Sequence, residues 1–530
     1  MPTLEWIGKS KVINHHQDVP FRVLERKYSF DENGQHNEDN GSENMIIRGD
    51  NLEALKALLP RYEGCVKCIY IDPPYNTGNE GWVYNDNVND PKIKKWLGEV
   101  VGKEDEDLTR HDKWLCMMYP RLKLLQKLLA DDGVIFISID EIEHRNLELV
   151  MDEIFGSANR IDTFVWQNNY GGGAKSNYVV HLHEYVLCFA KNISTVGKIE
   201  LPPDDNILKY YKYKDEKFDT RGPYRLQPLA TTSMDDRPNL RYPLFYEGHE
   251  VWPAKQWFWS KERALEAQAN DELVFSEKNG KWTVNYKQYL NGADGTQRKS
   301  KPYSIITGIY TQAGTKAIKE IMGSGKAFDF PKPPELIMYF IQMITGEDDI
   351  VLDSFAGSGT TAHAVLNMNK ADGGHRKFIL VEMMDYADSI TAERVKRVIR
   401  GYGEGKNAVE GTGGNFSFYD LGEPLLHGDV LNENVGVEKI REYVYFTDTK
   451  ASLPESHPDE PYFMGVHIGS AYYFYYEKQA VTTLNREFLH TVKTKADSYV
   501  IYADLCTLSE AELEKYHITF KKIPRDITKL

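Results

Sequence analysis

Two short apolar segments of the chain end abruptly in residues that cannot continue a β-strand. Residues 66–71 (VKCIYI) lead directly into Asp72-Pro73-Pro74-Tyr75, and residues 350–352 lead into a glycine-rich loop, residues 353–360. Proline removes a backbone N–H donor, and glycine permits turns that other residues resist. Because open α/β sheets bind ligands at the carboxyl ends of their strands, both motifs are expected to face a ligand.

Strand-like and helix-like segments alternate around these two motifs. Apolar residues at helical spacing predict helices over residues 51–59, 114–129, 335–344 and 360–369. Short apolar runs predict strands over residues 45–48, 66–71, 134–139, 184–190 and 377–381. This alternation indicates an α/β fold with a largely parallel sheet. A long polar loop is expected at about residues 76–110.

The α/β alternation is interrupted, which divides the chain into segments. Residues 195–328 are rich in Tyr, Trp, Lys, Gly and Pro and show no long helical period, so we interpret them as an inserted domain. The flanking segments 1–194 and 329–402 would form the two halves of one α/β domain. A glycine-rich joint begins at residue 401, and residues 403–530 are predicted to form a C-terminal α+β region.

Composition bears on where the protein is located and on what it can bind. No run of about 18 apolar residues is present, and the N-terminus lacks a basic start followed by an apolar stretch, so we expect no membrane span and a cytoplasmic protein. The net charge of −15 taken alone argues against a nucleic-acid partner, but such binding depends on a local basic surface rather than on the sum.

The glycine-rich loop has the features of a nucleoside site. It lacks the lysine of a triphosphate-binding loop and the GxGxxG spacing of a dinucleotide fold. Glu382 ends the next predicted strand, where a carboxylate can accept hydrogen bonds from ribose hydroxyls. A ribose without pyrophosphate favours S-adenosylmethionine. The alternatives are a simple tight turn and a strand-end carboxylate that faces water.

Asp72-Pro73-Pro74-Tyr75 suits a planar ring that carries an amino group. The proline carbonyls and the Asp72 carboxylate can accept its N–H bonds, and Tyr75 offers a face for stacking. Such a site would make the amino nitrogen a better nucleophile, by positioning and electrostatics, and we expect no metal. A base in duplex DNA would have to be flipped out to reach it. The alternative is a strand end closed by a rigid turn.

Seven segments in order resemble the amino-methyltransferases of DNA, in the permuted arrangement called the β class. They are IRGDNLEALKALL, IYIDPPYN, DDGVIFISID, HEYVLCFAKN, FPKPPELI, VLDSFAGSGTTAHAV and FILVEM, within residues 44–192 and 328–400. The resemblance implies a Rossmann-like, S-adenosylmethionine-dependent methyltransferase sheet in permuted order, interrupted by a target-recognition domain.

The chain also resembles one group within that class, the Mod subunits of type III restriction–modification systems. Residues 401–422 and the tail from residue 499 carry this likeness. It implies a homodimer that acts on double-stranded DNA with a flipped adenine, and it leaves open a helicase–nuclease restriction subunit as a further partner.

The resemblance assigns roles to individual residues. It places Asp72, Pro73, Pro74 and Tyr75 at the target base. The residues that it places at the cofactor are Asp50, Asn51, Asp72, Lys332, Asp353, Phe355, Ala356, Gly357, Ser358, Gly359, Thr360 and Glu382. Within this set, Glu382 would bind the ribose and Lys332 would lie near the amino-acid end.

Asp at position 72 favours adenine-N6 as the target. Cytosine-N4 methylation and a non-catalytic DNA-binding subunit that keeps the fold stay open as alternatives. Sequence specificity is expected in residues 195–328, where basic side chains alternate with tyrosines, as in residues 209–214 and 221–225. A solvated strand edge is the other interpretation of these runs.

Overall fold

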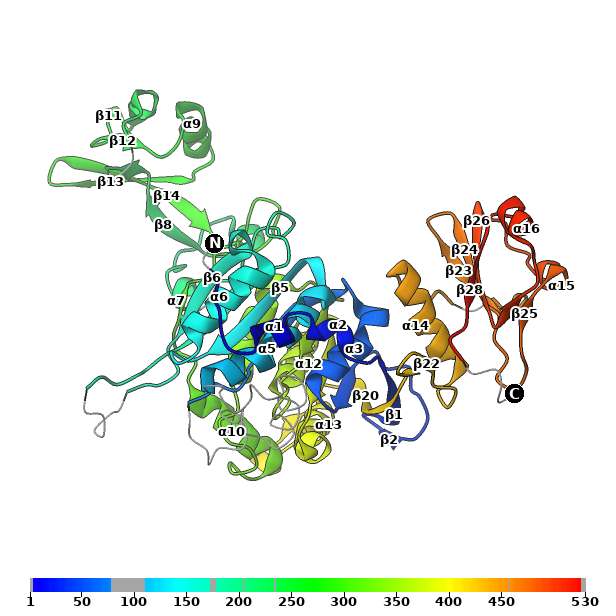
Figure 1. Cartoon of the computed structure of the whole chain (residues 1–530). Coiled ribbons are helices and arrows are strands. Elements are labelled where there is room, and N and C mark those ends of the chain that lie inside the picture. The colour runs from blue at the N-terminus through cyan, green and yellow to red at the C-terminus, as the bar shows by residue number, and fades with distance from the viewer. Residues whose placement is uncertain are drawn as a thin grey trace. The chain divides into compact units, whose positions relative to one another are not determined.

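The structure is a computed structural model that describes residues 3–77, 110–171, 178–203, 205–232, 235–455 and 457–525. Most of the polar loop expected at residues 76–110 lies outside these ranges. The chain forms two compact units, one of Met1–Lys198 with Tyr303–Leu530 and one of Ile199–Pro302 (Figure 1). None of the helices in the described ranges is long and apolar enough to cross a membrane.

The larger unit is built on one 11-stranded sheet. Its order is β15 (Ile305–Ile306), β6 (Arg160–Trp166), β7 (Glu184–Ala190), β5 (Leu129–Ile139), β4 (Val66–Ile71), β16 (Ile350–Asp353), β17 (Lys377–Glu382), β3 (Met45–Arg48), β20 (Asn415–Pro424), β1 (Arg22–Asp31) and β2 (Gly34–His36). The six strands from β5 to β20 are mutually parallel. The predicted α/β class is therefore confirmed.

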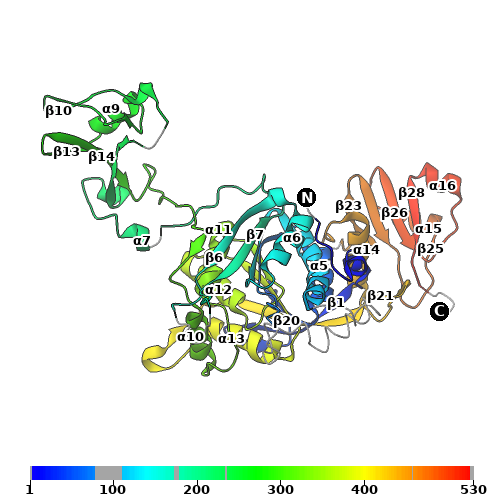
Figure 2. The same cartoon turned by 60° about the vertical axis from the view of Figure 1, so that its left-hand side comes forward.

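Helices cover both faces of this sheet, because its buried strands are apolar on both sides. Helices α3 (Asn51–Tyr62), α5 (Arg110–Leu128) and α6 (His144–Phe155) share a core with Ile69 and Ile71 of β4. On the other face, Phe340 of α11 (Pro334–Ile344) packs on Tyr70 and Phe136, with ring centroids 6.2 and 4.8 Å apart. Helices α12 (Thr360–Asp372) and α13 (Glu393–Arg400) continue that second layer (Figure 2).

Two segments of the larger unit lie elsewhere than the sequence indicated. Residues 303–328 were expected in the insert, but β15 pairs with β6, and α10 (Thr311–Met322) packs on α13. β20 was expected in the C-terminal region, but it pairs with β3 and β1 in the main sheet. A two-residue strand has no detectable period, and a strand that follows a glycine-rich joint gives no sign of its pairing partners.

The rest of the C-terminal segment has the α+β character predicted for it. Four strands form one sheet in the order β23 (Phe463–His467), β24 (Ser470–Phe474), β26 (Ser498–Ala503) and β28 (Ile518–Lys522). Helix α14 (Val437–Thr449) precedes the sheet and α16 (Glu510–Lys515) leads into β28. A buried ion pair, Arg525 with Asp504 at 2.5 Å, fixes the end of this region.

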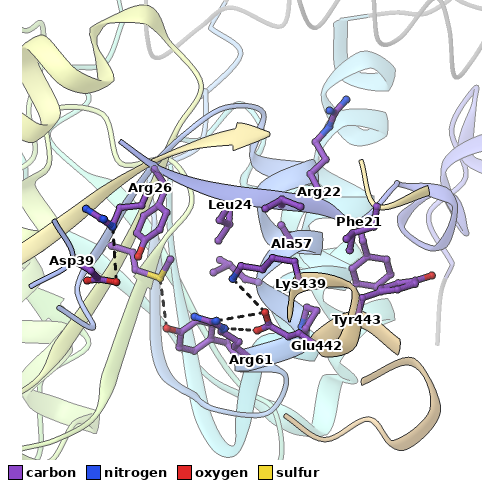
Figure 3. Close-up of a pocket in the computed structure, with 17 residues that line it drawn as sticks. Phe21, Arg22, Leu24, Arg26, Asp39, Ala57, Arg61, Lys439, Glu442 and Tyr443 are labelled. Atoms are coloured by element: carbon purple, nitrogen blue, oxygen red, sulfur yellow. Dashed lines mark hydrogen bonds and ion pairs between the residues drawn. The ribbon is translucent and has the colours of Figure 1, made fainter. Parts of the chain in front are cut away.

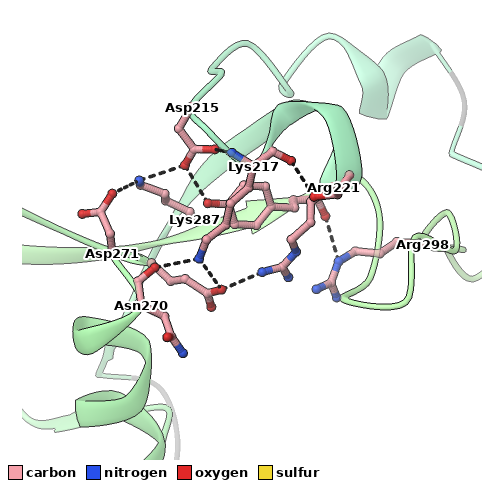
Figure 4. Close-up of polar contacts among 10 residues, drawn as sticks. Asp215, Lys217, Arg221, Asn270, Asp271, Lys287 and Arg298 are labelled. Atoms are coloured by element: carbon pink, nitrogen blue, oxygen red, sulfur yellow. Dashed lines mark hydrogen bonds and ion pairs between the residues drawn. The ribbon is translucent and has the colours of Figure 1, made fainter.

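The smaller unit contains a three-stranded antiparallel sheet, β13 (Leu273–Lys278), β14 (Lys281–Tyr289) and β8 (Tyr224–Pro228), together with helix α9 (Lys261–Ala269). Its apolar core includes Trp257 and Val284. A polar network lies beside β14: Lys287 contacts Asp215 at 2.9 Å and Asp271 at 2.7 Å, and the Tyr289 hydroxyl donates to Asp215 at 2.6 Å (Figure 4). Asp215 thus ties the segment before β8 to β14.

Replacing Asp215 by alanine is expected to destabilise the smaller unit. The change leaves the buried Tyr289 hydroxyl without its acceptor and removes one of the two carboxylates that face Lys287. We expect a loss of about 1–3 kcal/mol of local stability. Native-state hydrogen exchange of the β8 and β14 amides in the whole chain measures it. Asp219→Ala, at an exposed position, is the control, and equal exchange in both variants would contradict the expectation.

Candidate active site

The pairing of β4 with β16 brings the two sequence motifs together. Cys68 and Ile69 of β4 pair in parallel with Val351 and Leu352 of β16. Both strands therefore end at the same edge of the sheet, where β4 continues into Asp72 and β16 into the glycine-rich loop. Two segments about 280 residues apart in the sequence meet there because they are neighbours in the sheet.

Asp72 and Tyr75 are buried at this edge, with exposed fractions of 9% and 6%. The indole N–H of Trp114 on α5 donates to the Pro74 carbonyl at 2.6 Å and holds the motif against the helix. No donor to the Pro73 carbonyl is found in the described ranges, so this carbonyl remains an acceptor next to the Asp72 carboxylate.

Lys332 lies between two carboxylates. Its ammonium is 3.0 Å from Asp72 Oδ1 and 3.3 Å from Glu184 Oε2, and it donates to the Tyr75 hydroxyl at 2.7 Å. Burial opposes the charge of Lys332, but the facing carboxylates raise its pKa, so it is cationic at neutral pH. Burial raises the pKa of Asp72, and Lys332 opposes that shift. Lys332 thus contacts both Asp72 and Tyr75 directly, and its place near the amino-acid end of a cofactor stays a prediction.

Glu184 is a site residue that the sequence alone did not reveal. It begins β7, accepts a hydrogen bond from the Tyr75 hydroxyl at 2.9 Å, and accepts another from Asn168 Nδ2 at 2.8 Å. The only signal in the sequence is a carboxylate directly before an apolar strand. Glu184 fixes the orientation of the tyrosine ring and brings a second negative charge to the site.

The glycine-rich loop is held by backbone and side-chain acceptors. Asp353 accepts from the Phe355 N–H at 3.0 Å and from the Thr361 hydroxyl at 2.5 Å. Gly359 has φ +80°, and a Cβ there would lie 3.0 Å from the Thr391 carbonyl. Glycine is therefore required where the loop enters α12.

Glu382 lies beneath the loop, where β17 ends. Its carboxylate accepts from the Gly357 N–H at 2.8 Å and from the Met384 N–H at 2.9 Å. Each oxygen retains further lone pairs, so the carboxylate can still accept from a ligand hydroxyl.

Asp50 and Asn51 connect the loop to the first helix. The Asp50 carboxylate caps α3 by accepting from the Leu52 N–H at 2.8 Å, and it lies 3.1 Å from buried Arg121. Asn51 Nδ2 donates to the Ser354 carbonyl at 3.0 Å. In the structure these residues therefore position α3 against the loop.

One small cavity, of about 20 Å³, joins the two motifs. Asp72 and Lys332 line it together with Phe355, Ala356, Gly357, Ser358 and Thr360 of the loop, and with Phe328 and Phe330. Phe330 has φ +52°, an uncommon conformation for a bulky residue. The Ser354 hydroxyl is buried without a hydrogen-bond partner in the described ranges.

These features fit a nucleoside sulfonium cofactor. The glycines allow close approach, Glu382 offers ribose acceptors, and the Asp72 carboxylate suits a nearby positive charge. Because the cavity is small, the segment around Phe330 must shift to admit a molecule of that size.

A larger cavity, of about 240 Å³, lies elsewhere in the same unit. Residues of β1, α3 and α14 line it, and both Arg61 and Lys439 contact Glu442 there (Figure 3). None of the predicted site residues is among its lining residues, so volume alone does not identify the functional site of this chain.

Comparison with known proteins shows the family to which the chain belongs. Residues 66–393 match the N6_N4_Mtase family, described as DNA methylase, and the chain belongs to this family.

The chain is similar to both Mod subunits and a type II methyltransferase. The type III restriction-modification enzyme StyLTI Mod subunit of Salmonella typhimurium is 34% identical over 68% of this chain, and the EcoPI Mod subunit of Escherichia phage P1 is 34% identical over 72%. Type II methyltransferase M.KpnI of Klebsiella pneumoniae is 34% identical over 65% of the chain and 81% of its own length. The matches span only 58% and 63% of the two Mod subunits.

The titration of Asp353 provides a test of the buried loop. Burial raises its pKa from 3.8 to about 7, so the folded state binds a proton that the unfolded state releases. Stability from this group is therefore lost as the pH rises from about 4 to 7 and is level above that. Asp353→Asn cannot titrate, so its unfolding free energy relative to wild type should rise by roughly 2 kcal/mol between pH 5 and pH 7.

Urea unfolding of both proteins at several pH values measures this difference. A difference between variant and wild type that stays constant across the range would show that Asp353 titrates alike in the folded and unfolded states, and would contradict the prediction.

Proposed function

We propose that the protein transfers a methyl group from S-adenosylmethionine to N6 of an adenine flipped out of double-stranded DNA. The observation that carries this proposal is that Asp72 and the glycine-rich loop line one cavity. The motif that would bind the base and the loop that would bind the cofactor thus line the same cavity, as a direct transfer requires. When bound, the cofactor would supply an electrophilic methyl group on a sulfonium.

The chain's own residues would prepare the amino group. The Asp72 carboxylate and the Pro73 carbonyl accept its two N–H bonds, which favours a nitrogen whose lone pair points at the cofactor side of the cavity. Tyr75, fixed by Glu184 and Lys332, offers a ring face against the base. Lys332 lies 3.0 Å from Asp72 and limits the cost of a buried carboxylate.

The cofactor side would be formed by Glu382 at the ribose and by Phe355, Ala356 and Gly357 along the loop. Ser358, Gly359 and Thr360, together with Asp353, would complete this side. Asp50 and Asn51 support it from α3.

Asp rather than Ser at position 72 supports adenine over cytosine-N4 as the target. The relatives named as Mod subunits support a role as the modification subunit of a type III system, in the cytoplasm.

We also propose that the inserted unit Ile199–Pro302 supplies the target-recognition function. Tyr210 and Tyr213 are 54% and 47% exposed there, and Lys209 lies 5.4 Å from the Tyr210 ring centre. Basic and aromatic side chains in such an arrangement suit phosphates and unstacked bases.

Replacing Asp72 by asparagine should abolish most methyl transfer while the cofactor still binds. The carboxylate is the charged acceptor for the amino group, so we expect a fall in rate of about 100-fold or more. Transfer of labelled methyl to unmodified DNA gives the rate, and mass analysis of the nucleosides gives the base. Asp348→Asn, at an exposed position, is the control. Unchanged activity in Asp72→Asn, or N4-methylcytosine as the product, would contradict the proposal.

The proposed homodimer can be tested by sedimentation equilibrium. The expected mass is twice the 61.0 kDa of one chain. A single species of 61.0 kDa across micromolar concentrations would contradict it.

A further inference from the structure

Arg394 on α13 is a fully buried cation without a carboxylate partner in the part of the chain that the structure describes. Its guanidinium donates to Ser358 Oγ and to Thr360 Oγ1, each at 2.7 Å, and approaches His363 Nδ1 at 3.2 Å. Burial lowers its pKa to about 10, which still leaves it charged at neutral pH. A buried charge held only by neutral groups is costly, so a compensating role is to be expected.

The contacts of Arg394 fix the direction of two hydroxyl groups. A guanidinium has no acceptor, so Ser358 Oγ and Thr360 Oγ1 must both accept from it. The two oxygens are 3.3 Å apart, and only one of their hydrogens can lie between them. At least one O–H is therefore left to donate elsewhere. Both residues line the small cavity that also contains Asp72 and Gly357.

The helix dipole also favours negative charge near Ser358 and Thr360, in addition to their hydroxyl donors. Helix α12 begins at Thr360, and its first backbone N–H groups carry the positive end of the helix dipole. The buried guanidinium adds a full positive charge behind this helix end. An anionic group of a ligand would thus be stabilised by O–H donors, backbone donors and the Arg394 charge together.

Lys332 does not compete for that anionic group. An ammonium has three donors, and those of Lys332 face Asp72, Glu184 and the Tyr75 hydroxyl. The donors of Lys332, which the resemblance placed near the amino-acid end of the cofactor, are thus directed at Asp72, Tyr75 and Glu184.

We propose that Arg394 is a positioning residue that holds Ser358 and Thr360 as donors to the α-carboxylate of S-adenosylmethionine. The carboxylate is the one anionic group of this cofactor, and it is absent from 5′-methylthioadenosine, which keeps the adenosine and the sulfur. The inference rests on the proposed function, because it requires that cofactor. It predicts that loss of Arg394 weakens binding only of ligands that carry the carboxylate.

Calorimetric titration of the whole protein with S-adenosylhomocysteine and with 5′-methylthioadenosine tests this selectivity. Arg394→Met keeps the length of the side chain without its charge or donors. We expect its affinity for S-adenosylhomocysteine to fall about tenfold or more, and its affinity for methylthioadenosine to change less than about threefold. Equal losses for both ligands would reduce Arg394 to a structural support and overturn the inference.

Two further variants keep the test decisive. Arg376→Met removes another buried arginine, which pairs with Asp372 at 2.9 Å and does not line the cavity, so both affinities should be unchanged. If Arg394→Met does not fold, the double variant Ser358→Ala with Thr360→Val removes the two donors and must show the same selective loss. Wild type that binds the two ligands equally would also overturn the inference. Wild type that binds neither would instead contradict the proposed function.

Discussion

The parallel pairing of β4 with β16 is the constraint on which the site depends. It aligns two strands about 280 residues apart in the sequence, so that Asp72 and the glycine-rich loop emerge at one edge of the sheet. The apolar helices on both faces fix this pairing, because each strand is buried on both sides. The contacts of the candidate site, including the ion pairs of Lys332, form at that edge of the sheet.

Charge is distributed within the site in a consistent way. Two carboxylates and one ammonium surround Tyr75 at the proposed base side, which leaves a net negative charge where a sulfonium methyl would approach. The buried Arg394 and the start of α12 make the other end positive. A ligand with a cationic centre and a distant carboxylate is complementary to this polarity, and a triphosphate is not.

The sequence predicted the features that depend on residues close together in the chain. Strands 66–71 and 350–352 and the loop after each were evident from apolar runs that end in Pro or Gly. Glu184, Trp114 and Arg394 were not evident, because Tyr75, Pro74 and Ser358, to which they bond, lie 109, 40 and 36 residues away and only folding brings them together. The same reason applies to β15 and β20, whose place in the main sheet is decided by pairing partners and not by their own pattern.

A crystal structure of the protein with S-adenosylhomocysteine tests the central claim most directly. The account predicts that the sulfur lies between Asp72 and Phe355, that the ribose hydroxyls contact Glu382, and that Phe330 has moved from its present position. Density for the ligand in the larger cavity beside Arg61 and Glu442, with the cavity at Asp72 unchanged, would contradict it.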